Sequence, residues 1–163
     1  MKYEFSAGGI VYKRGRTRKE KDTQKNAEKI LILVARHSMH HGWVFPKGLI
    51  GDTKENKNQT KEETAIREVR EETGIDAKIE NKIEPVQYWY VWKGDPSTGS
   101  GRGKIKKTVY YFVMRFTRGN IEDHDEEMEE VEWIDYNEVQ NRLTYPSDKK
   151  AWREAQKFFT KIP

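Results

Sequence analysis

Cysteine is absent from the 163 residues of this chain. Its absence excludes disulfides, thiolate metal sites and cysteine nucleophiles. Long apolar runs are absent as well, since no stretch approaches the ~20 residues that a membrane-spanning helix needs. The segment from Met1 to Lys13 lacks an apolar core of signal-peptide length. We therefore expect a soluble, cytoplasmic protein without a membrane partner.

Hydrophobic residues make up only 34% of the chain, but it contains five Trp and eight Tyr, which can build a core. A chain of this length is sufficient for one compact domain, and we expect residues 1–163 to form it. The net charge of +4 and the pI near 9.1 suit an anionic partner without identifying one.

Two polar segments are predicted to be insertions. The first, Lys13–Lys29, has eight basic and three acidic residues and almost nothing apolar. It could contact nucleic acid or gather an anionic substrate, but a solvated connector is the favoured interpretation. The second, Gly94–Lys104, is predicted to be a flexible hairpin tip between aromatic runs.

An α+β fold with a mixed sheet and helices on both faces is predicted from apolar periodicity and capping signals. Thr60 followed by Glu63 is a capping box, and Gly74 stands where a helix would stop. A last amphipathic helix is expected from Ser147 onward. The expected strands are Phe5–Tyr12, Ile30–Ala35, Val86–Trp92, Thr108–Phe116 and Val131–Ile134.

The first of these helices carries three carboxylates on one face. Glu68, Glu71 and Glu72 stand at spacings of three and four residues, so their side chains lie within a few ångströms of one another. Such a cluster is unfavourable unless a cation neutralises it, and oxygen ligands favour Mg²⁺ or Mn²⁺ over zinc. Arg67 can reach Glu63 or Glu71 and fix a carboxylate. Taken alone, the cluster is more typical of a solvated helix face.

The surrounding residues resemble the Nudix box, whose family pattern is G-x5-E-x7-R-E-U-x-E-E-x-G-U with U aliphatic. Its second half is matched at every fixed position by Arg67, Glu68, Val69, Glu71, Glu72, Gly74 and Ile75. The chain departs from the pattern between Gly48 and Arg67, which are five residues further apart than in the family. With the insertion inside Gly51–Lys57, Gln59 takes the position of the first Glu, and Asp52 or Glu55 could substitute for it.

The resemblance implies a Nudix-type α/β/α sandwich and metal-dependent hydrolysis of a nucleotide's phosphate–phosphate linkage. Glu68, Glu71 and Glu72 are the implied ligands for Mg²⁺, and Mn²⁺ is an alternative. The implied catalytic residues are Glu71, Glu72, Arg67 and Glu127. Glu127 comes from the late acidic run, in which Glu126 and Glu129 also stay open.

Further motifs resemble bacterial diadenosine tetraphosphate hydrolases: FPKG before the box, PVQYWYVWKG, KKTVYYFVMRF and the final RLTYPSDKKAWREA. A dinucleoside polyphosphate is therefore the expected substrate, with lysines for its phosphates and aromatic rings for its bases. The candidate substrate-binding residues are Lys47, Tyr88, Tyr90, Lys107 and Tyr145. His40 and His41 could reach the phosphates or lie at a strand edge. Trp89, Trp133 and Phe112 are expected in the core.

Three alternatives stay open. A nucleoside triphosphate pyrophosphatase of the MutT type would share the box, and an RNA 5′-pyrophosphohydrolase would use the basic segment on capped or triphosphorylated RNA. The third is a nucleotide-sensing domain without catalysis, in which Gln59 would mark decay of the site. The complete second half of the box argues against that third alternative.

Overall fold

The computed structural model describes residues 2–16, 28–92 and 103–161. Eight strands form one sheet, and two main helices pack against it. The strands are β1 (Lys2–Gly15), β2 (Lys29–His37), β3 (Trp43–Val44), β4 (Lys47–Leu49), β5 (Ile75–Lys82), β6 (Val86–Trp92), β7 (Gly103–Gly119) and β8 (Met128–Asp135). The helices are α1 (Lys61–Thr73), η2 (Ile121–Asp123), η3 (Tyr136–Glu138), α2 (Val139–Arg142) and α3 (Pro146–Phe159).

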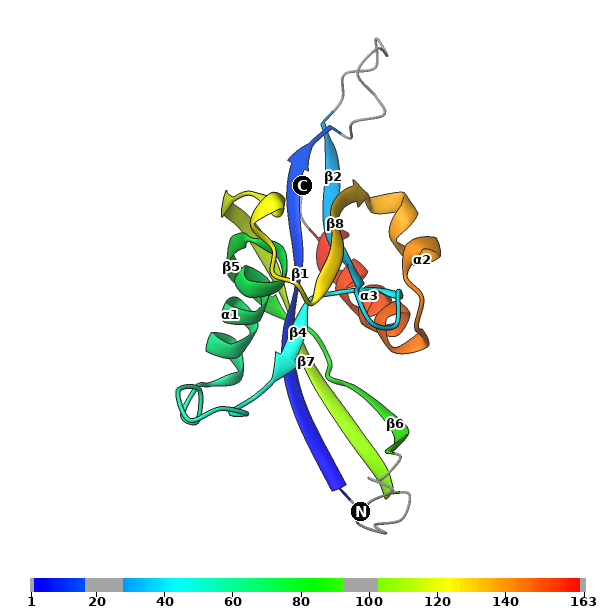
Figure 1. Ribbon diagram of the computed structural model, residues 1–163. Helices are drawn as coiled ribbons and strands as arrows, with labels where there is room; N and C mark the ends of the chain where they lie inside the picture. The colour runs from blue at the N-terminus through cyan, green and yellow to red at the C-terminus, as the bar shows by residue number, and fades with distance from the viewer. Residues whose placement is uncertain (1, 17–27, 93–102, 162–163) are drawn as a thin grey trace.

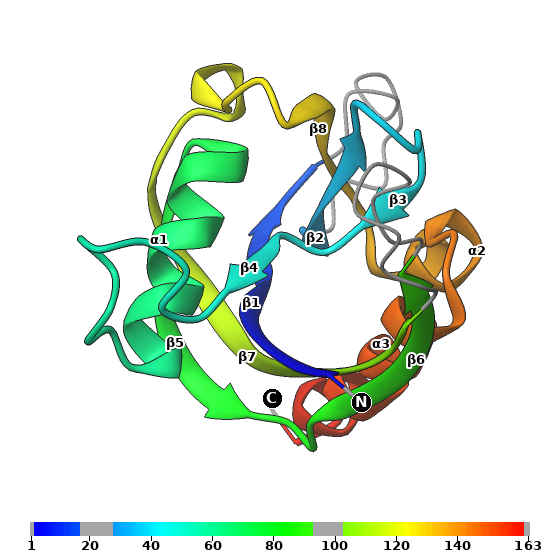
Figure 2. The same cartoon turned by 60° about the horizontal axis from the view of Figure 1, so that its bottom comes forward.

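The centre of the sheet is the parallel pair β1–β7, which runs from Lys2 opposite Ile105 to Tyr12 opposite Arg115. All other pairings are antiparallel, so the sheet is mixed, as predicted. The helices α1 and α3 lie on opposite sides of this pair (Figures 1 and 2). Among the described residues, no helix is long and apolar enough to cross a membrane.

Each face of the sheet has its own core. On the α3 side, Trp152 packs among the rings of Phe45, Tyr136 and Phe159. On the α1 side, Ala65 and Val69 pack against β1, β2 and β7. The residues Leu31–Ala35 of β2 are buried, as predicted for a strand covered on both faces.

The helix α1 begins and ends where its capping residues predict. The Thr60 hydroxyl accepts a hydrogen bond from the backbone N–H of Glu63, and the Glu63 carboxylate accepts one from the backbone N–H of Thr60. At the other end, Gly74 adopts a left-handed conformation with φ of 77°. These two caps fix which turns of the helix face the sheet, and so fix the direction of its carboxylates.

The predicted hairpin is present as β6 and β7, with Tyr88 opposite Lys107 and Trp89 opposite Lys106. Side chains alternate between faces, so Tyr88 and Tyr90 share one side, with ring centroids 6.4 Å apart. Trp89 points the other way and is 50% exposed, so its prediction as a core residue is wrong. No described helix covers that end of the sheet on the Trp89 side (Figure 1).

Of the other two residues predicted to lie in the core, one is buried and one is half-buried. Several helices and strands begin or end at residues other than those predicted. Phe112 is buried, and Trp133 is half-buried with the Lys13 ammonium 4.4 Å from its ring centroid. The last helix begins at Pro146, directly after the capping residue Tyr145, one residue before the predicted start. The ends of both predicted insertions belong to strands, because Lys13–Gly15 extends β1 and Gly103–Lys104 opens β7. Residues 17–27 and 93–102 lie outside the described residues.

Candidate active site

The helix α1 and the strand β4 meet at two carboxylates. Glu68 and Glu72 stand one turn apart, are 8% and 3% exposed, and face β4. The backbone N–H of Lys47 donates a hydrogen bond of 3.1 Å to Oε2 of Glu72. Gly48 passes so close to Glu68 that any Cβ atom there would overlap its carboxylate. The sequence Pro–Lys–Gly before the box therefore forms the wall against which these carboxylates are held.

Arg67 links three side chains around this pair. Its Nη1 lies 3.0 Å from Oε1 of Glu68 and 3.0 Å from Oε2 of Glu71. Its Nε donates a hydrogen bond of 2.9 Å to Oε1 of Gln59. The predicted reach to Glu71 is present, whereas Glu63 serves the helix cap instead. The neutral Gln59 thus has a definite role, because it orients Arg67 without adding negative charge.

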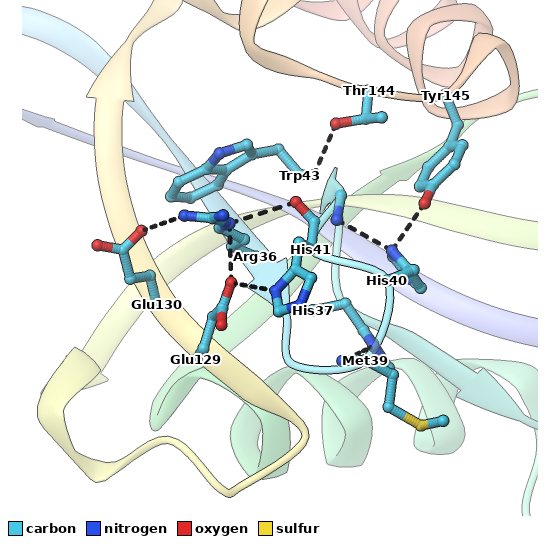
Figure 3. A network of polar contacts seen from close by, with 11 residues as sticks. Arg36, His37, Met39, His40, His41, Trp43, Glu129, Glu130, Thr144 and Tyr145 are labelled. Carbon is cyan, nitrogen blue, oxygen red and sulfur yellow. Dashed lines mark hydrogen bonds and ion pairs between the residues drawn. The ribbon is translucent and has the colours of Figure 1, made fainter.

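Glu127 joins the buried pair from the loop before β8. Its side chain lies within hydrogen-bonding reach of that of Glu72, and its charge acts on Glu68 as well. Glu129 instead pairs with Arg36 and His41, at 2.8 and 2.9 Å (Figure 3). The geometry therefore separates these two members of the acidic run and brings Glu127 to the carboxylates of α1.

The carboxylates of Glu68 and Glu72 repel one another and are largely buried. Burial raises the pKa of Glu68 to about 7, and the Arg67 guanidinium opposes this shift. Burial raises the pKa of Glu72 well above its usual value, and the charge of Glu68 and the nearby Glu127 carboxylate add to the effect. A divalent cation would relieve this repulsion, and an all-oxygen donor set suits Mg²⁺.

The carboxylates are not preassembled around an ion. Among the described residues, no three or more His, Asp or Glu side chains are arranged to hold a metal. Glu71 lies at the rim, with its side chain 51% exposed, where it pairs with Arg67. The donor chemistry fits Mg²⁺, but the side chains of Glu68, Glu72 and Glu127 would have to adjust to bind it.

Glu68, Glu72 and Glu127 line a cavity of about 380 Å³, whereas Glu71 and Arg67 do not line it. Three kinds of polar group converge on it: carboxylates, ammonium groups and rings. They are Asp52, Glu68, Glu72, Glu127, Lys47, Lys107, His37, His40 and Tyr88. Asp52 thus reaches the site from the longer loop, whereas Glu55 does not line the cavity. A larger cavity of about 710 Å³ lies beside Trp133 and Lys13, and of the candidate site residues only Glu129 lines it.

Lys107 is a partly buried cation opposite the carboxylates. Burial lowers its pKa, and the nearby Lys47 ammonium lowers it further. Asp148, which sequence reasoning missed, lies buried close to both lysines and holds the segment between β3 and β4. Its Oδ1 accepts hydrogen bonds from the Phe45 backbone N–H, at 3.2 Å, and from the Tyr111 hydroxyl, at 3.3 Å.

The aromatic candidates divide into two groups. Tyr88 lines the cavity, while the Tyr90 hydroxyl donates a hydrogen bond of 2.7 Å to Glu4. On another wall, the rings of His37 and His40 are stacked with centroids 4.2 Å apart. The Tyr145 hydroxyl lies 2.7 Å from Nδ1 of His40, so it borders the cavity indirectly (Figure 3).

The two stacked imidazoles have a defined tautomer. Nδ1 of His37 accepts the backbone N–H of Met39, and Nδ1 of His40 accepts that of Gly42. A neutral ring then carries its proton on Nε2, which remains a hydrogen-bond donor. His41 has a φ of 59°, pairs with Glu129 and does not line the cavity. Of the two roles predicted for it, the position at a strand edge therefore agrees with the structure.

Replacing Gly48 by Ala is expected to reduce activity about 100-fold, because the new methyl group must displace the Glu68 carboxylate. Steady-state hydrolysis rates measure the effect. Gly103→Ala is the matched control, since nothing lies within 4 Å of a Cβ at that position. Equal activity of both variants would contradict the placement of Glu68.

Comparisons with known proteins agree on one family. The model of the NUDIX domain matches residues 21–156. The protein MutT4 of Mycobacterium tuberculosis is 34% identical over 98% of this chain, which spans only 57% of the length of that relative. The mouse asymmetrical bis(5′-nucleosyl)-tetraphosphatase is 31% identical over 82% of both chains. The crystal structure of a C. elegans Ap4A hydrolase complex has a TM-score of 0.59 at 17% identity, covering 98% of this chain and 99% of that one.

Proposed function

The chain belongs to the Nudix family, and from this premise we propose that it hydrolyses a phosphoanhydride bond of a nucleotide in the 380 Å³ cavity. Family members generally use divalent metals such as Mg²⁺. The observation that carries the proposal is the convergence of Glu68, Glu72 and Glu127 with Lys47 and Lys107 on that cavity. Carboxylates suited to a divalent cation thus lie beside ammonium groups suited to phosphate.

The residues divide the work of such a reaction. Glu68 and Glu72 would hold Mg²⁺ together with Glu71 from the rim, and the ion would neutralise phosphate charge and acidify a bound water. Arg67 keeps the carboxylates of Glu68 and Glu71 in position. To Glu127 we assign the role of accepting the proton of the attacking water, because it enters the cluster from a separate loop and lines the cavity.

A dinucleoside polyphosphate is the substrate that the cavity supports best. Rings reach the cavity from two elements: Tyr88 of β6, with Tyr90 beside it, and His40, with Tyr145 bonded to it. Two separate stacking surfaces suit a ligand with two bases, and Lys47 and Lys107 suit the phosphate chain that joins them. The name of the mouse relative agrees with this choice.

The substrate is tested by incubating the purified chain with Mg²⁺ and separating the products by chromatography. Diadenosine tetraphosphate is expected to be cut to ATP and AMP faster than oxidised dGTP, ADP-ribose or triphosphorylated RNA. Faster cleavage of oxidised dGTP would favour the MutT-type alternative, with which the name of the relative MutT4 agrees. No cleavage of any compound with Mg²⁺ or Mn²⁺ would overturn the proposed reaction.

A further inference from the structure

One end of the sheet carries exposed aromatic side chains that no described element covers. The first residues of β1, the first half of β7 and the strand β6 project beyond the helices α1 and α3 (Figure 1). On one face of these strands, Tyr3 is 57%, Phe5 47%, Trp89 50% and Val91 56% exposed. These four are among the five exposed large hydrophobic side chains of the described residues, so the exposure is concentrated on one surface.

The register places lysines between these rings. Lys106 of β7 stands opposite Tyr3 on one side and opposite Trp89 on the other. Its ammonium lies 5.5 Å from the centroid of the Trp89 ring. Lys104 stands opposite Val91 in the next row. Because neighbouring strands are ~4.8 Å apart, Tyr3 and Trp89 present two rings about 10 Å apart with a cation between them.

The charge on this surface has one sign. Its remaining positions on the three strands are Thr108, Gln87 and Tyr110, so none of its described side chains is acidic. Where α1 begins, Lys61 adds another ammonium, 4.7 Å from the centroid of the Tyr110 ring. A second copy of the chain docked through this surface would bring lysines against lysines. An anion with flat rings is complementary both to the charge and to the aromatic side chains.

We propose that this surface binds single-stranded nucleic acid, whose bases stack on Tyr3, Phe5 and Trp89 and whose phosphates contact Lys104 and Lys106. Stacking accepts any base, so we expect little sequence preference. Tyr88 and Lys107, which line the cavity, point to the opposite side of the same strands. The proposal is therefore independent of the reaction proposed above, and a strand can bind while the cavity is occupied.

The test is fluorescence anisotropy with a labelled single-stranded oligoribonucleotide of about 12 nucleotides carrying a 5′-hydroxyl, in EDTA, first without and then with saturating diadenosine tetraphosphate. The double variant Tyr3→Ala/Trp89→Ala is expected to weaken binding at least tenfold, because it removes two rings on which bases stack. Lys106→Ala should also make the slope of log affinity against log salt shallower by about 0.7. Lys78→Ala, an exposed lysine of β5, is the matched control and should change neither quantity.

Three results would overturn the proposal. They are the absence of binding by the unmodified chain at low salt, an equal loss in the Lys78→Ala control, and competition by diadenosine tetraphosphate, which would place the strand in the cavity. Analytical ultracentrifugation tests whether the surface instead binds a second copy of the chain. A dimer that Trp89→Ala dissociates, without any oligonucleotide binding, would assign the surface to a second copy. Thermal melting of each variant shows that the fold is intact.

Discussion

Replacing Glu72 by Gln is expected to lower turnover on the order of 10²–10⁴-fold while the melting temperature stays the same or rises. The carboxylate is almost fully buried beside Glu68 and Glu127. A divalent cation bound there would need its negative charge, which Gln does not carry. The amide of Gln can still accept the hydrogen bond from the Lys47 backbone N–H, which keeps the contact between α1 and β4. Burial raises the pKa of Glu72 and so favours its neutral form in the metal-free protein, and a neutral amide in its place costs no stability there.

The measurement is kcat with Mg²⁺ on whichever nucleotide the chain hydrolyses, together with a melting curve in EDTA. Glu62→Gln is the matched control, because it makes the same chemical change on the same helix away from the cavity. Full activity of Glu72→Gln would remove this residue from the site, and a collapse of the melting temperature would show that its role is structural.

The second large effect is on stability. The metal-free protein is expected to lose about 2–4 kcal/mol of unfolding free energy as the pH rises from about 4.5 to about 7. In this window the folded state retains the proton of Glu68, whose pKa is raised to about 7, while the unfolded state has lost it. The folded state binds more protons there, so its stability falls with increasing pH. The raised pKa of Glu72 acts in the same direction.

Urea unfolding in EDTA at pH 4.5 and pH 8 measures this difference. Glu68→Gln should remove most of it, since the amide does not titrate, and Mg²⁺ at pH 8 should restore stability by binding the folded carboxylates. Stability that rises from pH 4.5 to pH 8 in the absence of metal would show that these carboxylates are solvated and not crowded together.

The parts of the structure that sequence reasoning predicted correctly depend on local chemistry. Thr60, Glu63 and Gly74 define α1 because capping involves residues only three or four positions apart. The strand β2 is predictable because a short, unbroken apolar run is typical of a strand that is buried on both faces. The direction of Glu68 and Glu72 toward the sheet follows from these local features together with helical periodicity.

The parts that it predicted wrongly or missed depend on distant contacts. Residue type favours a core position for Trp89, yet its side chain is 50% exposed. Asp148 has the sequence pattern of an ordinary first-turn acidic residue, and its bonds to Phe45 and Tyr111 connect residues far apart in the chain. The alternation of lysine with aromatic residues across β1, β6 and β7 exists only once the three strands are aligned.

The acidic run before β8 illustrates the same limit. Neighbouring carboxylates in that run are chemically identical, and only the path of the backbone sends Glu127 to the cavity and Glu129 to Arg36. The choice of Glu127 agrees with the geometry, but its role as the base stays a prediction. Gln59, which first suggested a weakened site, is tied to Arg67 by a contact that residue type alone would not reveal.

The parallel pairing of β1 with β7 also constrains how the molecule acquires its fold. Lys2 and Ile105 are 103 positions apart, so β1 is synthesised long before the strand that it pairs with. Until then, its apolar stretch from Ile10 to Tyr12 has no completed sheet to enter and is exposed to aggregation. Because closing so long a loop precedes the main pairing, refolding should be slow, in the millisecond-to-second range typical of non-local sheets.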